Sequence, residues 1–232
     1  MTDKPVWAIL MSKKLAEARH FDPNAPLGER AKVFTLAHNF AIDSVNSVGH
    51  ALTRIIEKIG GVDPDALPVT ALGGPEAIAA FSRNAVDGFV SNPPWSEQIL
   101  AMGNAVIIAN SLTGDPEWMT PFGAGVVITR RQFCVDHRPI CVKMGQSLVE
   151  AVAFVHEHKP EALAVLRAHF PQIDAGVTER SFATIEKSTS AKPVIVETAI
   201  SNADRVNIEA GFMKLDEKLG SYGDLFTNEF VQ

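Results

Sequence analysis

Polar side chains that could bind an anion occur at two places in the chain. Ser44 and Ser47 stand just before segment 48–59, whose apolar stripe predicts a helix, and Asn92 follows the apolar run 87–91. A helix N-terminus has free backbone N–H groups and a partial positive charge, which favour a negatively charged oxygen. The serine hydroxyls can donate hydrogen bonds to the same oxygen. The pattern predicts contacts to a nitrate, sulfonate or carboxylate group, with plain N-capping and a turn-forming Asn as the alternatives.

Further residues are candidates for the same site. His38 and Asn39 belong to the loop that contains Ser44, and the alternative for both is a solvated loop. Pro93 follows Asn92 and helps to stop the strand, since proline cannot donate to a sheet ladder. Phe122 could form an apolar wall beside a ligand, with core packing as the alternative. The same two roles apply to three tryptophans: Trp7, Trp95 and Trp118.

Motifs for covalent or metal chemistry are missing from the sequence. His156 and His158 are two positions apart on an expected helix and point about 200° apart, which excludes a shared zinc ion. No phosphate-cradling Gly-x4-Gly-Lys and no Gly-x-Ser-x-Gly elbow occurs. We therefore expect no cofactor, no metal and no catalysis. Cys134 and Cys141 are expected to be inert thiols, with a bridge or a reactive cysteine as alternatives.

The candidate residues must be positioned by an α/β sheet. Segment 69–91 predicts a strand at 69–72, a turn at Gly73-Gly74, a helix opened by Pro75 and a second strand at 87–91. Ligands of open α/β sheets lie at the carboxyl ends of the strands, where Asn92 falls. Further strands are expected at 5–11, 32–37, 105–110 and 123–129. Helices are expected at 94–102, 131–136, 139–158, 160–169, 177–188 and 195–213.

Size and charge limit the classes of protein that the chain can be. The 232 residues are 46% hydrophobic and 21% charged, which is typical of a globular protein with a real core. The net charge is −6 and no basic run exceeds two residues, so nucleic acid is not an expected partner. The short apolar run 5–11 is expected to be a strand, so no signal peptide is recognised.

Several motifs resemble those of the nitrate/sulfonate/taurine class of periplasmic substrate-binding proteins that serve ABC importers, a family related to pyrimidine-synthesis proteins of thiamine metabolism. The longest is GGPEAIAAFSRNAVDGFVSNPP, at 73–94. Others are the Pro5-Val6-Trp7 strand, the segment from Pro26 to Val33 and the Thr129–Phe133 segment. The tail also matches, through Tyr222, Asp224, Leu225, Thr227, Phe230 and Val231.

The resemblance implies an α/β, type II periplasmic-binding-protein-like fold with one complete lobe, residues 12–120. The hinge strands and the helical C-terminal part of the other lobe would come from 1–11 and 121–232, so the first lobe is expected to be truncated. The implied function is to bind a small, anionic solute in an interlobe cleft without catalysis, with an ABC permease as partner.

Several alternatives to this function remain. One is an enzyme on the same scaffold, of the pyrimidine-synthesis or desulfinase type, and another is a cytoplasmic ligand sensor. A homodimer through the incomplete lobe is a further expectation. The resemblance implies a periplasmic location, whereas the lack of a recognised signal peptide would place a complete chain in the cytoplasm.

Overall fold

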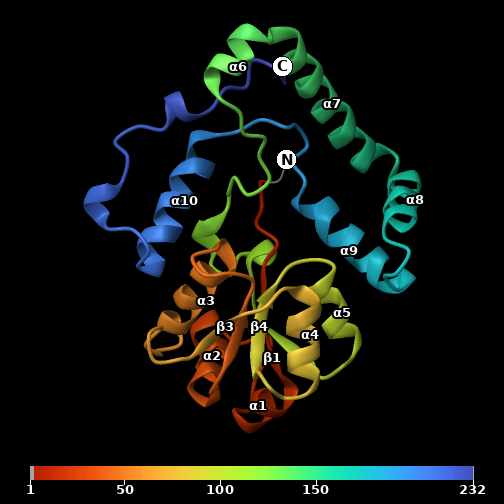
Figure 1. The fold of residues 1–232 in the computed structure, drawn as a ribbon. Helices are drawn as coiled ribbons and strands as arrows, with labels where there is room; N and C mark the ends of the chain where they lie inside the picture. Colours follow the sequence, from red (N-terminus) through yellow and green to blue (C-terminus); the bar gives the residue numbers. More distant parts are fainter. Residues whose placement is uncertain (1–2, 232) are drawn as a thin grey trace. The chain divides into compact units, whose positions relative to one another are not determined.

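The computed structural model describes residues 3–231, which fall into two compact units (Figure 1). The first, the α/β unit, contains Val6–Glu117 and Arg205–Lys218. The second, the helical unit, contains the described residues 3–5, 118–204 and 219–231. The chain therefore passes between the units four times.

The α/β unit is built on a five-stranded sheet with strand order β3-β2-β4-β1-β5. Its strands are β1 (Ala8–Ser12), β2 (Phe40–Ile42), β3 (Val69–Ala71), β4 (Gly88–Ser91) and β5 (Ala105–Asn110). Strand β2 pairs in parallel with β3 and β4, while β1 runs antiparallel to its neighbours β4 and β5. Four strands thus end at one edge of the sheet, which we call the carboxyl edge.

Helices cover both faces of this sheet (Figure 1). They are α1 (Lys13–Ala18), α2 (Leu27–Ala31), α3 (Val48–Ile59), α4 (Gly74–Ser82) and α5 (Trp95–Ala101). Leu10 and Phe89 pack under α4 and α5 in one apolar cluster. Ile9, Phe40 and Ile42 alternate to the opposite face and are fully buried there. Both faces of the sheet are thus apolar, as is typical of strands covered by helices on both sides.

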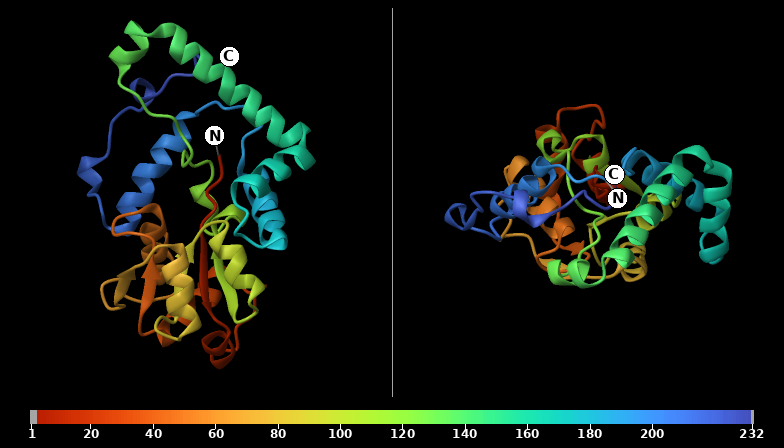
Figure 2. Two further views of the ribbon diagram at one scale, coloured as in Figure 1. Left: turned by 45° about the vertical axis from the view of Figure 1, so that its right-hand side comes forward. Right: turned by 90° about the horizontal axis from the view of Figure 1, so that it is seen from above.

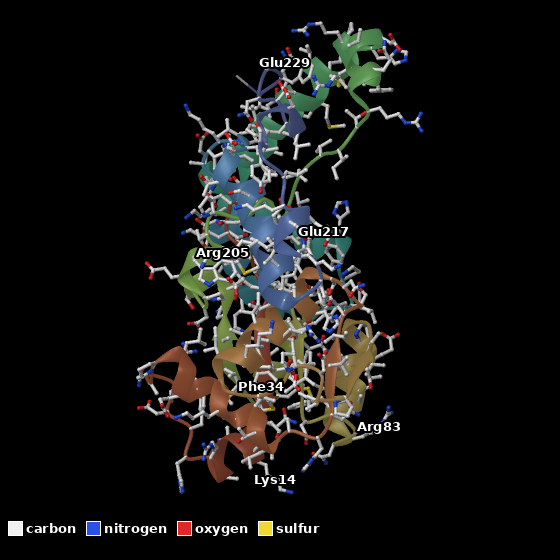
Figure 3. The ribbon with its side chains drawn as sticks, turned by 90° about the vertical axis from the view of Figure 1, so that its left-hand side faces the viewer. Lys14, Phe34, Arg83, Arg205, Glu217 and Glu229 are labelled. Carbon is white, nitrogen blue, oxygen red and sulfur yellow. A yellow bond between two sulfur atoms is a disulfide. The ribbon has the colours of Figure 1, made fainter. Side chains whose placement is uncertain are left out.

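The expected strand at 32–37 is wrong. Lys32–Leu36 is a 3-10 helix that continues directly from α2, and the strand of this region is β2, four residues beyond Leu36. The adjacent Val33 and Phe34 are both buried, which a helical turn allows and a one-sided strand does not. Phe34, labelled in Figure 3, packs against Phe40 of β2 with ring centroids 5.3 Å apart.

The helical unit holds most of the remaining helices. They are α6 (Arg131–Asp136), α7 (Arg138–Glu157), α8 (Lys159–His169), α9 (Ala175–Ser188) and the first part of α10 (Glu197–Ala210). Short 3-10 turns occupy Ser111–Thr113, Glu117–Met119, Leu215–Glu217 and Gly223–Leu225. The predicted helices of this half are confirmed to within a few residues at each end.

Two expectations for the helical unit are wrong. Residues 123–129 form no strand; this segment is irregular, and Ile128 is 86% exposed. Cys134 and Cys141 are not thiols but form a disulfide between α6 and α7, with their Cα atoms 5.7 Å apart. The helix breaks at His137, and this break turns α7 back so that the two cysteines can meet.

The end of α10, from Arg205 to Ala210, belongs to the α/β unit and is held there by α3. Arg54 donates from Nε to the carbonyl oxygen of Ala210 (2.7 Å), and Lys58 donates from Nζ to that of Glu209 (2.7 Å). These cations satisfy carbonyl groups at the negative end of the helix. Phe212, just beyond α10, packs against Arg54 and His50.

Candidate functional site

The carboxyl edge brings together two of the predicted ligand-binding segments and one neighbouring loop. Ser44 and Ser47 follow β2, Asn92 and Pro93 follow β4, and the neighbouring turn Gly73-Gly74 follows β3. Because β2, β3 and β4 are parallel and adjacent, these loops leave the sheet side by side. The three loops lead into the N-termini of α3, α4 and α5.

The loop after β2 is ordered by its own side chains. Ser47 is the N-cap of α3: its hydroxyl oxygen accepts from the backbone N–H of His50 at 3.0 Å and its hydroxyl donates to Asp43. A Cβ atom on Gly49 would lie 2.7 Å from the Asp43 carboxylate, so this carboxylate lies against the first turn of α3. The positive end of α3 is thus already partly balanced by an internal carboxylate. Ser44 is exposed and free to turn toward a ligand.

The loop after β4 presents Asn92. Its carbonyl oxygen accepts from the N–H groups of Trp95 (3.0 Å) and Ser96 (3.2 Å) and so starts α5. Within residues 3–231, the Asn92 side-chain amide forms no hydrogen bond, although it is half-buried. An amide without a partner at this edge can both donate to and accept from a ligand.

Trp95 has a packing role beside this loop. A Cβ atom on Gly74 would collide with the indole ring of Trp95, so the ring lies directly on the backbone at the start of α4. Glycine at 74 is therefore required for the close approach of α4 and α5. This contact is the packing role that was the alternative to a ligand wall.

His38 and Asn39 do not reach the carboxyl edge. They precede β2 and lie at the opposite end of the strand from Ser44 and Ser47, because the strand of this region is 40–42 rather than 32–37. The backbone N–H groups of His38 and Asn39 donate to Asp87, before β4, at 2.7 and 3.3 Å. The Asn39 amide donates to the carbonyl oxygen of Ala85.

Phe122 belongs to the helical unit, where it is buried with 3% of its surface exposed. Its N–H donates to the carbonyl oxygen of Asp3 at 2.9 Å. Trp118 lies in the Glu117–Met119 turn. Trp7 precedes β1 at the carboxyl edge, and its carbonyl oxygen accepts from the N–H and hydroxyl of Ser111.

His50, on the first turn of α3, supports the candidate loop through a hydrogen bond. It was not identified from the sequence as a functional residue. It is buried, and its Nδ1 accepts from the backbone N–H of Asn46 at 3.0 Å, where Asn46 has a φ of 61°. Burial, with a contribution from Arg54, lowers the pKa of His50, and Asp43 partly opposes this. A neutral His50 is needed because a protonated Nδ1 cannot accept a hydrogen bond.

We expect His50 to make the protein less stable in acid. In the unfolded chain this histidine takes up a proton near its ordinary pKa of 6.5, whereas folded His50 resists protonation, so stability falls as the pH drops below 6.5. Urea unfolding between about pH 7 and 5 measures this fall, and His50→Phe is expected to reduce it. His169→Gln, on an exposed helix end, is the control. Equal pH dependence in the native protein and His50→Phe would rule this role out.

Other features of the chain lie away from the carboxyl edge. Two cavities, of about 320 and 440 Å³, share Phe21 and lie where α1 and α2 meet the other end of the sheet. None of the predicted ligand-binding residues lines them. Among residues 3–231, no group of three His, Cys, Asp or Glu side chains could hold a metal ion. Within the same residues, no helix has the length and apolarity to span a membrane.

The arrangement defines a periplasmic-binding-protein-like α/β fold, and solved structures share it. The periplasmic aliphatic sulphonate binding protein SsuA from Escherichia coli is 16% identical, with a TM-score of 0.65. That match covers 92% of this chain and 63% of the E. coli protein, so the chain spans less than two thirds of this relative. A protein from Bordetella bronchiseptica RB50 is 14% identical, with a TM-score of 0.74 over 99% of this chain and 70% of that one.

One enzyme is also similar in fold. The desulfurization enzyme DSZB is 11% identical, with a TM-score of 0.55 over 98% of this chain and 75% of the enzyme. Residues 7–168 match the model of the NMT1-like family. This match covers more than half of the chain, and the protein therefore belongs to the NMT1-like family. No curated protein sequence matches the chain.

Proposed function

We propose that this protein is the solute-binding component of an ABC-type importer and that it performs no catalysis. Its carboxyl edge supplies ligand contacts from Ser44, Ser47 and Asn92, with Pro93 as an apolar neighbour. The half-buried, unbonded amide of Asn92, beside the capped loop of α3, is the observation that carries this proposal. The sulphonate-binding relative of the same fold supports it.

The charges at the carboxyl edge favour a solute with both signs of charge. The three loops, 43–47, 72–75 and 92–96, contain no Lys or Arg, and Asp43 is exposed among them. A solute ammonium group would pair with Asp43, while its anionic oxygens accept from Ser44 and Asn92. An amino-sulfonate such as taurine satisfies both conditions, whereas nitrate satisfies only the second.

Transport would require a membrane permease as partner and a location outside the cytoplasm. The disulfide between Cys134 and Cys141 supports this location, because disulfides persist in oxidising compartments such as the periplasm. Both cysteines of the chain are joined in this disulfide. Neither is available as a nucleophilic thiol while the bond is intact.

A thermal-shift panel tests the proposal with taurine, an alkanesulfonate, nitrate, sulfate and a pyrimidine as probes. A ligand at a hundredfold excess over its Kd stabilises by about 2.7 kcal/mol, which raises Tm by roughly 5–10 °C in a chain of this size. We expect the largest shift with taurine. A panel in which no compound raises Tm would contradict solute binding, and a shift with nitrate or sulfate alone would contradict the role of Asp43.

Substitutions at the carboxyl edge locate the binding site. Asn92→Ala and Asp43→Asn are each expected to weaken taurine binding about tenfold and so to reduce the rise in Tm that taurine causes. Asn92→Ala removes a hydrogen bond from a half-buried amide, and Asp43→Asn removes the charge that pairs with the ammonium group. Asn104→Ala is the matched control, because Asn104 precedes β5 at the other edge of the sheet. Equal losses in Asn104→Ala and Asn92→Ala would place binding elsewhere.

A further inference from the structure

One side of α7 has an apolar stripe that the described residues leave uncovered. Its members, spaced by four and three residues, are Ile140, Met144, Ser147, Ala151 and Phe154. This spacing puts them on a single line along the helix. All five are exposed, with Ile140 at 53%, Met144 at 49% and Phe154 at 37%. Soluble helices normally turn such a stripe toward a core, so an exposed one marks an interaction surface.

The neighbouring side of α7 is covered by the chain itself. Cys141, Gly145 and Val152 are buried, and a Cβ atom on Gly145 would collide with the backbone of Phe230. The C-terminal tail accordingly runs beside α7, as both views of Figure 2 show. The tail and the other helices therefore cover only part of the apolar surface of α7, and the stripe lies outside the covered part.

Two charged residues beside the stripe have opposite signs, one on each side of its centre along the helix. Lys143 and Glu150 lie on the same flank of α7, on the side away from Gly145. Lys143 comes before Ser147 at the centre of the stripe, and Glu150 comes after it. A second α7 running in the opposite direction would bring its Glu150 to Lys143 and its Lys143 to Glu150. A parallel copy would put the two flanks on opposite sides and form neither pair.

The apolar members of the stripe have the same symmetry. Ile140 and Phe154 are each seven residues from Ser147. In an antiparallel pair centred on Ser147, Ile140 of one copy would pack against Phe154 of the other. The small Ser147 and Ala151 side chains at the centre allow the two helices to approach to the usual 8–10 Å between axes.

We propose that α7 is a dimerisation helix, and that the exposed stripe takes an antiparallel α7 from a second copy of this chain. The stripe and its flanking charges are self-complementary, which is the property that a two-fold symmetric interface requires. Helix α7 belongs to the helical unit, whereas the candidate solute contacts Ser44, Ser47 and Asn92 belong to the α/β unit.

Light scattering of the purified protein tests the proposal directly. We expect a mass of twice the 25.0 kDa of one chain, reached at a plateau as the concentration rises. Met144→Glu is expected to return the mass to that of a single chain, because it buries a charge in the interface. Val165→Glu on α8, where Val165 is 50% exposed, is the matched control and is expected to stay dimeric. A single-chain mass at every concentration, or a mass without a plateau, would overturn the proposal.

Charge reversal tests the direction of the pairing without disturbing the apolar stripe. Lys143→Glu and Glu150→Lys each create two like-charge contacts in the dimer and are expected to raise its Kd several-fold. The double variant restores both pairs and is expected to recover most of the affinity. Additive losses in the double variant would exclude the antiparallel register.

A cysteine at the centre of the stripe gives a covalent readout. The two natural cysteines form a disulfide, so Ser147→Cys adds a single free thiol to the described chain. At the two-fold centre this thiol would meet its own copy and form a linked dimer on mild oxidation. Gln146→Cys, on the polar side of α7, is the control and is expected to stay unlinked. Equal linking of both variants would show random collision and contradict the interface.

Discussion

Raising the pH through the whole interval from below 4.5 to above 8 is expected to destabilise the protein through Glu57, by up to about 5 kcal/mol. Glu57 lies on α3 with no exposed surface, and neither of its carboxylate oxygens has a hydrogen-bond partner among the described residues. Burial raises the pKa of Glu57 from 4.5 to about 8, against a smaller opposing effect of Arg54. Ionising this carboxyl group inside the protein is therefore costly.

The direction of the effect follows from proton binding. Above pH 4.5 the unfolded chain releases this proton, while the folded protein keeps it until about pH 8. Stability therefore falls through this window and stops falling above it. The interval from 4.5 to about 8, at about 1.4 kcal/mol per pKa unit, gives the figure of about 5 kcal/mol.

Urea unfolding at several pH values measures the effect. Glu57→Gln keeps a neutral side chain of the same shape, so it is expected to remove most of the slope and to exceed the native protein in stability at pH 8.5. Glu17→Gln, at an exposed position of α1, is the matched control and should leave the slope unchanged. Parallel curves for the native protein and Glu57→Gln would show that Glu57 does not bind a proton in this range.

Replacing Arg30 by methionine is expected to cost about 3–5 kcal/mol of stability, because it leaves a buried charge unpaired. The Arg30 guanidinium donates to both carboxylate oxygens of Asp115, at 2.7 and 3.0 Å, and to the backbone carbonyl groups of Ala25 and Ile108. The two charged side chains are only 13% and 15% exposed. A bidentate pair of this kind joins α2 to β5 and to the loop after it.

A second ion pair in the same region supplies the control. Lys32 pairs with Glu29 at 2.6 Å, but their side chains are 41% and 60% exposed. Lys32→Met is therefore expected to change stability by about 1 kcal/mol or less. Urea unfolding compares the contributions of the buried and the exposed pair to stability. The variants to measure are Arg30→Met, Lys32→Met and the double variant Arg30→Met/Asp115→Leu. The double variant should recover part of the loss, and equal effects of the two single variants would contradict the burial argument.

The parts of the fold that local sequence determines were predicted well. Helix α3 has the predicted bounds, since Ser47 caps its first turn, Leu52 and Ile56 form its buried stripe, and Gly60 ends it. The position of Asn92 at the end of β4 followed in the same way from the two prolines after it. The capping serine, the terminating glycine and the two prolines each lie within a few residues of the helix or strand end that they determine.

The failures come from contacts between residues far apart in the sequence. Residues 32–37 are a short apolar run that fits a strand or a helical turn. The helix that they continue contains Arg30, whose partner Asp115 is 85 positions away. Because of this error, His38 and Asn39 were predicted at the carboxyl edge, whereas they lie at the opposite end of β2. The ligand identity depends on side-chain orientation and on charges from several loops, which no local pattern specifies.

The disulfide shows the same limit at shorter range. In one continuous helix, Cα atoms seven residues apart would be about 10.5 Å apart, too far for a disulfide. The break at His137 brings those of Cys134 and Cys141 to 5.7 Å. The expected helices 131–136 and 139–158 placed the break correctly, but the angle between the two helices does not follow from a local pattern.

The return of α10 to the α/β unit has a consequence for synthesis on the ribosome. The acceptor of Arg54, the Ala210 carbonyl group, is synthesised 156 residues after Arg54 itself. At about 5–20 residues per second this takes roughly 10–30 s, during which the nascent sheet lacks its final helix. The α/β unit therefore reaches its native state only after nearly the whole chain has been translated, and until then the surface of α3 that α10 covers is open to chaperones.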